Sequence, residues 1–95
     1  MYIVNLNYLK PVSEVDNHVV AHRAFLDEYY ARGVFIASGP RNPRDGGVII
    51  ASSHASRAEL DEILAKDPFS QNGIASYQVT EFVPTKHHPM LTAIL

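Results

Sequence analysis

The feature that most constrains the fold is the order of six short segments whose apolar residues repeat with the spacing of a strand or a helix. Near the start of the chain, Tyr2, Val4 and Leu6 alternate with other residues, as in a strand with one apolar face. In the next segment apolar residues recur every three or four positions, as in an amphipathic helix. The pattern predicts strands at residues 2–9, 34–38, 48–53 and 74–83, and helices at residues 13–32 and 56–66.

Residues typical of helix ends support these boundaries. Ser56 and Glu59 have the spacing of a capping box, which satisfies backbone amides at the start of a helix. Ser13 and Asp16 resemble a second capping box, with Asp in place of the more usual Glu. Gly33 follows the first helix, where a left-handed residue commonly ends a helix.

The order strand–helix–strand–strand–helix–strand predicts an α+β fold. Two right-handed βαβ crossovers that share one sheet give the ferredoxin-like arrangement, a four-stranded antiparallel sheet with both helices on one face. The length of 95 residues allows a single domain, predicted at residues 1–84, with a C-terminal tail at residues 85–95 that docks on another surface. Because the strands carry apolar residues on both sides, we expect a second copy to cover the open face, in a homodimer or a higher homo-oligomer.

Composition removes several classes of function. The chain has no cysteine, which excludes disulfides, thiol nucleophiles, cysteine-ligated zinc and iron–sulfur clusters. Eight basic and ten acidic residues give a net charge of −2, so no nucleic-acid partner is expected. The aliphatic runs at 34–37 and 48–51 are far shorter than the roughly 20 residues of a membrane span. With no secretory signal visible, we expect a cytoplasmic protein that does not bind membranes.

The histidine in the first predicted helix is the most informative single residue. His22 shares an apolar stripe with Val19, Leu26 and Tyr29, where histidine is unusual. It is either a core histidine whose ring nitrogens are satisfied locally or a functional group that titrates near neutrality. His18 lies one turn earlier, at the spacing of a zinc-binding pair, but no further ligand accompanies it, so no metal is expected.

Other polar residues leave two interpretations open. Asp67 follows the second helix and precedes Pro68, so its carboxylate either turns inward toward the sheet or belongs to an ordinary turn. Arg41 and Arg44 stand in a loop rich in Gly and Pro, where they either anchor an anionic ligand or remain solvated. His87 and His88 in the tail have no assigned role. No phosphate-binding loop, dinucleotide fingerprint or nucleophile elbow is present, and we expect no cofactor.

Several of these residues together resemble the YciI-like (YCII) family over nearly all of the first 84 residues. The Asp-Pro-Phe step after the second helix is the most specific element of the resemblance. The matching positions are the run from His22 to Leu26, Gly33, Ser38-Gly39-Pro40, Ala55-Ser56, Asp67-Pro68-Phe69 and Gly73.

The resemblance implies a dimeric α/β-barrel in which two ferredoxin-like sheets pack face to face. It also implies an active site that pairs the helix-one histidine with the aspartate of Asp-Pro-Phe, here His22 and Asp67. One branch of the family is associated with dehydrochlorination of chlorinated hydroxyquinols in aromatic degradation. The sequence departs from the family at Val19, where members commonly carry Arg, and in its longer tail.

The resulting hypothesis is a small cofactor-free enzyme, dehydrochlorinase-like (a lyase) or isomerase-like, acting on a small aromatic or enolisable substrate. His22 and Asp67 would be the catalytic acid–base pair, since a carboxylate on one imidazole nitrogen raises the basicity of the other. The alternative is a non-catalytic dimeric module that binds a small molecule or assists a partner enzyme, with Asp67 pointing to solvent. A heme-free oxygenase or isomerase of the wider α/β-barrel group is a third option. The predicted substrate-binding residues are Ser38, Gly39, Pro40, Arg41 and Phe69.

Overall fold

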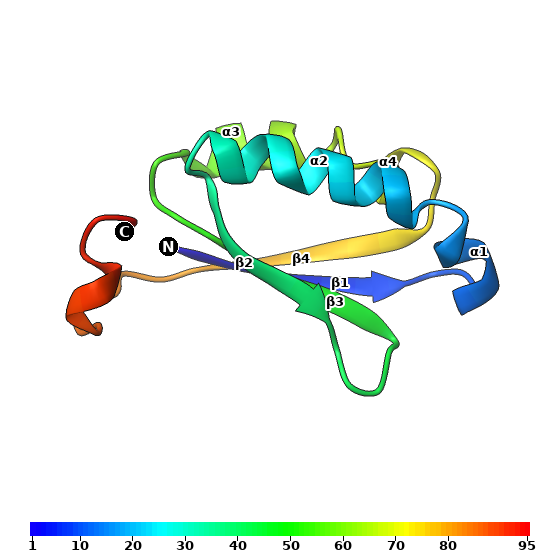
Figure 1. The fold of residues 1–95 in the computed structure, drawn as a ribbon, viewed down its shortest axis with the longest axis horizontal. Coiled ribbons are helices and arrows are strands. Elements are labelled where there is room, and N and C mark those ends of the chain that lie inside the picture. The colour runs from blue at the N-terminus through cyan, green and yellow to red at the C-terminus, as the bar shows by residue number, and fades with distance from the viewer.

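The computed structural model describes residues 1–95 and contains one antiparallel sheet of four strands (Figure 1). Across the sheet the strands lie in the order β2-β3-β1-β4, and each neighbouring pair is antiparallel. This is the order that two interleaved βαβ units produce, and it confirms the predicted ferredoxin-like α+β fold. The strands are β1 (Tyr2–Tyr8), β2 (Phe35–Pro40), β3 (Gly46–Ala51) and β4 (Ala75–Glu81).

The principal helices, α2, α3 and α4, lie on one face of the sheet (Figure 1). The alternation predicted for the first strand is confirmed, because Tyr2, Val4 and Leu6 point toward these helices and are at most 3% exposed. The capping box predicted at Ser56 and Glu59 is also confirmed: the Ser56 hydroxyl accepts the Glu59 amide, and the Glu59 carboxylate accepts the Ser56 amide. The helices are α1 (Val12–Asp16), α2 (Val19–Ala31), α3 (Arg57–Leu64), α4 (Pro68–Gln71) and a 3-10 turn, η1 (Pro89–Leu91).

The predicted single helix over residues 13–32 is wrong in one respect, because it is broken into α1 and α2. The amide of Asn17 bonds the carbonyl of Glu14 at 3.2 Å, a tight three-residue turn that ends α1, and α2 begins after His18. The capping box predicted at Ser13 and Asp16 is also wrong. No side chain caps α1, and the Asp16 carboxylate instead accepts a hydrogen bond from Arg44 in the β2–β3 loop. The break places His22 in the first turn of α2.

The sheet face opposite the helices is only partly covered. Ile3 lies opposite Ile50 in the β1–β3 ladder, and Val48 follows two residues earlier on the same side. All three side chains are half-buried, and no helix packs on this face (Figure 1). The tail leaves the sheet after β4 and carries Met90, whose side chain is 82% exposed. None of the helices is long and apolar enough to cross a membrane.

The β2–β3 hairpin depends on a glycine at its second strand. A Cβ atom at Gly46 would lie 1.9 Å from the carbonyl oxygen of Leu6 and 2.4 Å from Nη2 of Arg41. The first contact is with backbone in the β1–β3 ladder, which cannot move without breaking the pairing. We therefore expect Gly46→Ala to lower the free energy of unfolding by about 1–3 kcal/mol in urea denaturation.

The matched control for this change is Gly39→Ala in β2. A Cβ atom at Gly39 would have no atom within 4 Å. Its effect on stability is expected to stay within about 0.5 kcal/mol, as for other unstrained surface changes. Equal destabilisation by the two substitutions would contradict the steric explanation.

Candidate active site

The structure brings His22 and Asp67 together from positions 45 residues apart. His22 projects from the first turn of α2, and Asp67 is the residue that precedes α4. The Nδ1 atom of His22 lies 2.8 Å from Oδ1 of Asp67. The interpretation in which Asp67 is an ordinary turn residue pointing to solvent does not match this geometry, because the carboxylate is fully buried.

Three hydrogen-bond donors hold the buried carboxylate in place. Asp67 caps the N-terminus of α4, where Pro68 takes the first helical position, and its Oδ1 accepts the amide of Phe69 at 3.0 Å. The same oxygen accepts from His22, and Oδ2 accepts the Tyr77 hydroxyl at 2.5 Å. A buried charge is stable only when it is fully hydrogen-bonded in this way. The cap geometry therefore fixes the carboxylate that orients the imidazole.

Tyr77 is a member of this group that sequence reasoning missed. It lies on β4 opposite Leu6 of β1, so its side chain points to the face that the helices cover. Burial, and next the negative charge and hydrogen bond of Asp67, raise the pKa of Tyr77 well above its usual value. The hydroxyl therefore stays protonated and donates to Asp67. The available signal was the two-residue spacing that places Tyr77 on the same face of the last strand as the buried Ala75.

Aromatic packing holds the imidazole ring of His22. The ring stacks on Phe69 with centroids 3.9 Å apart and planes 2° apart, while Phe25 lies farther away at 6.4 Å. Because the carboxylate only accepts, the neutral ring carries its proton on Nδ1 and a lone pair on Nε2. Nε2 of His22 has no hydrogen-bond partner within the chain, whereas every buried side-chain nitrogen or oxygen of the protein has one. Nε2 is therefore open to solvent.

A cavity of about 230 Å³ adjoins His22 and lies between the start of α2 and residues of β1, β2 and β3. Four of the five predicted substrate-binding residues line it together with His22. Ser38 is one of them, and its hydroxyl is 2.6 Å from the hydroxyl of Tyr30. The four are Ser38, Gly39, Pro40 and Phe69.

Arg41, the fifth predicted residue, does not line this cavity. Its guanidinium bonds the carboxylate of Asp45 at 3.0 Å and the side-chain oxygen of Asn7 at 2.9 Å. Asn7 alternates with the core residue Leu6, so Arg41 lies toward the open face of the sheet. The hairpin thus places Arg41 away from the imidazole.

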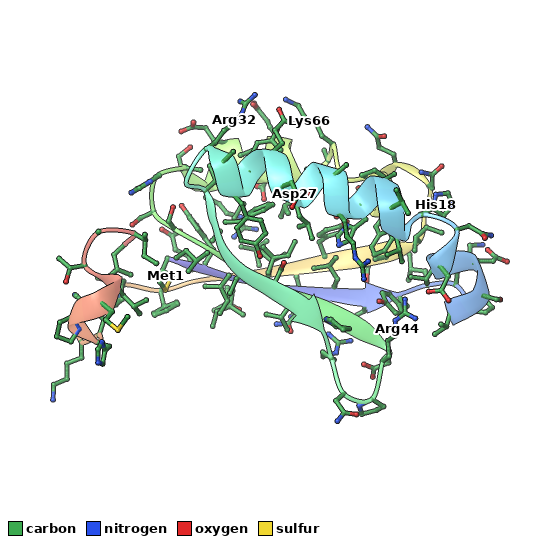
Figure 2. The ribbon with its side chains drawn as sticks, viewed as in Figure 1. Met1, His18, Asp27, Arg32, Arg44 and Lys66 are labelled. Atoms are coloured by element: carbon green, nitrogen blue, oxygen red, sulfur yellow. The ribbon has the colours of Figure 1, made fainter.

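Three charged side chains also line the cavity: Asp16, Arg23 and Arg44. Of these, only Arg44 was predicted from the sequence as a candidate anchor for an anionic ligand. Nη2 of Arg44 is 2.7 Å from Oδ1 of Asp16, and the guanidinium lies 5.9 Å from the centre of the Tyr8 ring. Figure 2 shows Arg44 at the same end of the molecule as His18, which precedes α2. The loop arginine that reaches the cavity is therefore Arg44.

None of the remaining histidines belongs to a cluster of metal-binding side chains. The structure contains no group of three or more His, Cys, Asp or Glu side chains that could hold a metal ion. His18 is the residue before α2 and makes no side-chain capping bond. In the tail, Nδ1 of His88 accepts the amide of Met90 at the start of η1.

Comparison with known protein families identifies the family of this chain. The model of the YCII-related domain matches residues 1–83. The chain belongs to the YCII-related family. No curated protein matches the sequence of this YCII-related chain.

Solved structures share the fold of this YCII-related chain, and one of them is an enzyme with a bound ligand. It is 5-chloro-2-hydroxyhydroquinone dehydrochlorinase (TftG) from Burkholderia phenoliruptrix AC1100, in complex with 2,5-dihydroxybenzoquinone. The two structures superpose with a TM-score of 0.71 over 87% of this chain and 94% of TftG, at 19% sequence identity. At that identity the likeness establishes the common fold.

Proposed function

We propose that this YCII-related protein is a small enzyme that uses His22 and Asp67 for acid–base chemistry on a small aromatic or enolisable substrate. The observation that carries the proposal is the buried Asp67 carboxylate bonded to Nδ1 of His22, whose ring lines the cavity and leaves Nε2 unbonded. A carboxylate in this position fixes the tautomer and stabilises the imidazolium that forms when Nε2 takes a proton. The reaction is an elimination such as dehydrochlorination, or an isomerisation.

The proton transfer follows from this arrangement. Nε2 of His22 removes a proton from an acidic hydroxyl or C–H group of the bound substrate. In an isomerisation the imidazolium returns the proton to another atom of the same molecule. In a dehydrochlorination of a chlorinated hydroquinone the imidazolium returns the proton to the ring carbon that bears chlorine. The C–Cl bond then breaks, chloride leaves with the bonding electrons and a second hydroxyl proton is lost, so that the substrate loses HCl overall. Neither reaction consumes an oxidant or a reductant.

The size of the cavity is compatible with one substituted aromatic ring. Its volume is about 230 Å³, whereas a protein cavity of roughly 150 Å³ accommodates benzene. The ligand in the TftG structure, 2,5-dihydroxybenzoquinone, is a single six-membered ring. Both observations support a monocyclic substrate.

Two assays test the proposal. The first measures chloride release from 5-chloro-2-hydroxyhydroquinone, the substrate in the name of TftG. The second uses NMR to follow deuterium exchange from solvent into an enolisable probe, cyclohexane-1,3-dione, which reports proton removal without a leaving group. We expect catalysis in at least one assay. A protein that accelerates neither reaction above the rate of His22→Gln would contradict the proposal.

We also propose that the protein is a homodimer, with the open faces of two sheets packed together. The half-buried Ile3, Val48 and Ile50 support this, because a second sheet would cover them. Light scattering after size-exclusion chromatography is expected to give twice the chain mass of 10.6 kDa. A monomer at micromolar concentration would contradict the dimer.

The open face is tested by placing a charge on it. Ile50→Asp would bury an unpaired carboxylate between the sheets, and we expect the dimer dissociation constant to rise at least about a hundredfold. Val20→Asp is the control, because Val20 is an 82% exposed apolar residue on α2 and lies away from this face. Equal dimerisation of the two variants would show that the interface lies elsewhere.

A further inference from the structure

One arginine of this chain lines the cavity without a carboxylate partner. Four of the five form ion pairs with a carboxylate, and Arg23 is the exception. Arg23 follows His22 in α2 and lines the same cavity. A guanidinium at a cavity wall with no carboxylate partner is available to an anion from outside the chain.

The second arginine of the cavity is held by a contact that a ligand can replace. Arg44 bonds Asp16 through Nη2, and both side chains are well exposed, at 38% and 55%. A guanidinium has five N–H donors, so this bond leaves the others free. Exposed pairs of this kind exchange readily because solvent screens their attraction. A substrate anion can join Arg44 beside Asp16 or take the place of Asp16.

The charges around the cavity favour an anion although the chain is acidic overall. Besides His22, the charged residues that line it are two arginines and one aspartate, Asp16. Asp67 lies behind the imidazole and has three donors of its own, so it does not neutralise the arginines at the cavity wall. The net charge of the whole chain is −2, which makes this local excess of positive charge distinctive.

We propose that Arg23 and Arg44 bind an anionic group of the substrate, a carboxylate or a phenolate, and that Asp16 holds Arg44 in place when that anion is absent. The inference deepens the proposed function and rests on it for the placement of the substrate in this cavity. An anion bound by the arginines orients the ring beside His22, so that the reacting proton faces Nε2. Arg23 and Arg44 are thus residues that determine specificity.

The test compares two probes of the same size that differ in charge, benzoate and benzamide. Each is titrated into ¹⁵N-labelled protein near neutral pH, and the amide signals of Gly39 and Gly47 report occupancy of the cavity that they line. We expect benzoate to bind at least about tenfold more tightly than benzamide, as a charge-assisted hydrogen bond would give. Added NaCl should weaken the binding of benzoate and leave that of benzamide unchanged.

Substitutions assign the preference to the two arginines. Arg23→Gln and Arg44→Gln should each weaken benzoate binding about tenfold and leave benzamide within about twofold. Asp16→Asn should strengthen benzoate binding, because it removes the competing carboxylate. The control is Arg32→Gln at the opposite end of α2 (Figure 2), where Arg32 pairs with Glu28, and this variant should bind both probes like the wild type.

Equal affinity for the two probes, binding of neither, or a preference that survives in the Arg23→Gln/Arg44→Gln double variant would overturn the inference. Because the titration measures binding alone, it separates this inference from the proposed function. A preserved preference without turnover would count against acid–base catalysis only. Turnover of a neutral substrate without any preference for benzoate would count against the arginines only.

Discussion

Replacement of His22 by glutamine is expected to lower kcat by about 10²–10⁴-fold, the usual contribution of a positioned acid–base group. Glutamine is polar and similar in length to histidine, but its amide nitrogen does not take up a proton near neutral pH. The stacking of the His22 ring on Phe69 is the main packing that this variant loses. The reaction therefore loses its base while the cavity keeps its walls, so KM should change by only a few fold.

The matched control for His22→Gln is His18→Gln, one turn earlier in the chain. The side chain of His18 makes no capping bond, and His18 does not line the cavity. We expect this variant to keep the wild-type kcat and KM in the chloride-release and deuterium-exchange assays. Full turnover by His22→Gln, or an equal loss in both variants, would remove His22 from the mechanism.

Replacement of Asp67 by asparagine is expected to reduce both activity and stability. The carboxylate accepts from His22, Phe69 and Tyr77 at the same time, whereas an asparagine has a single acceptor oxygen and places an NH₂ group against one of these donors. The variant also loses the negative charge that stabilises the imidazolium. We expect kcat to fall at least about a hundredfold and the free energy of unfolding to fall by about 1–3 kcal/mol.

Two further variants separate the parts of this effect. Tyr77→Phe keeps the charge of Asp67 and removes one donor, so it should lower stability by about 1 kcal/mol with a smaller loss of kcat than Asp67→Asn. Asp61→Asn is the control, because Asp61 is an exposed partner of Arg57 on α3, and its effect on stability should be within about 0.5 kcal/mol. Urea denaturation and the chloride-release assay measure both quantities. Wild-type turnover by Asp67→Asn would contradict the role of the carboxylate.

The sequence was sufficient to predict the four strands and the helices at residues 13–32 and 56–66, because the information for them is local, whereas the short α4 was not predicted. The alternation of Tyr2, Val4 and Leu6 determines which face of β1 is buried, and the reciprocal bonds of Ser56 and Glu59 lie within one turn of helix. The break between α1 and α2 was missed because no Gly or Pro marks it. It depends on the tight turn at the end of α1, which apolar spacing does not reveal.

The candidate site was predictable where a motif carried it and not where contacts between distant elements decide it. His22 was singled out by its place on an apolar helical stripe, its pairing with Asp67 came from a resemblance, and the structure brings the two to 2.8 Å. Tyr77 reaches Asp67 from β4, which sequence spacing alone does not specify. Arg41 and Arg44 stand in one loop with the same charge, and only the folded hairpin brings Arg44 to the cavity.

The most direct test of the account is the protonation of the His22 ring in its neutral form, measured by a long-range ¹H–¹⁵N NMR spectrum of the labelled protein. The geometry at Asp67 predicts a proton on Nδ1 and a bare Nε2, with this preference reduced in Asp67→Asn. A ring that carries its proton on Nε2 and leaves Nδ1 bare would contradict the account, because the atom beside the cavity would then be unable to accept a proton.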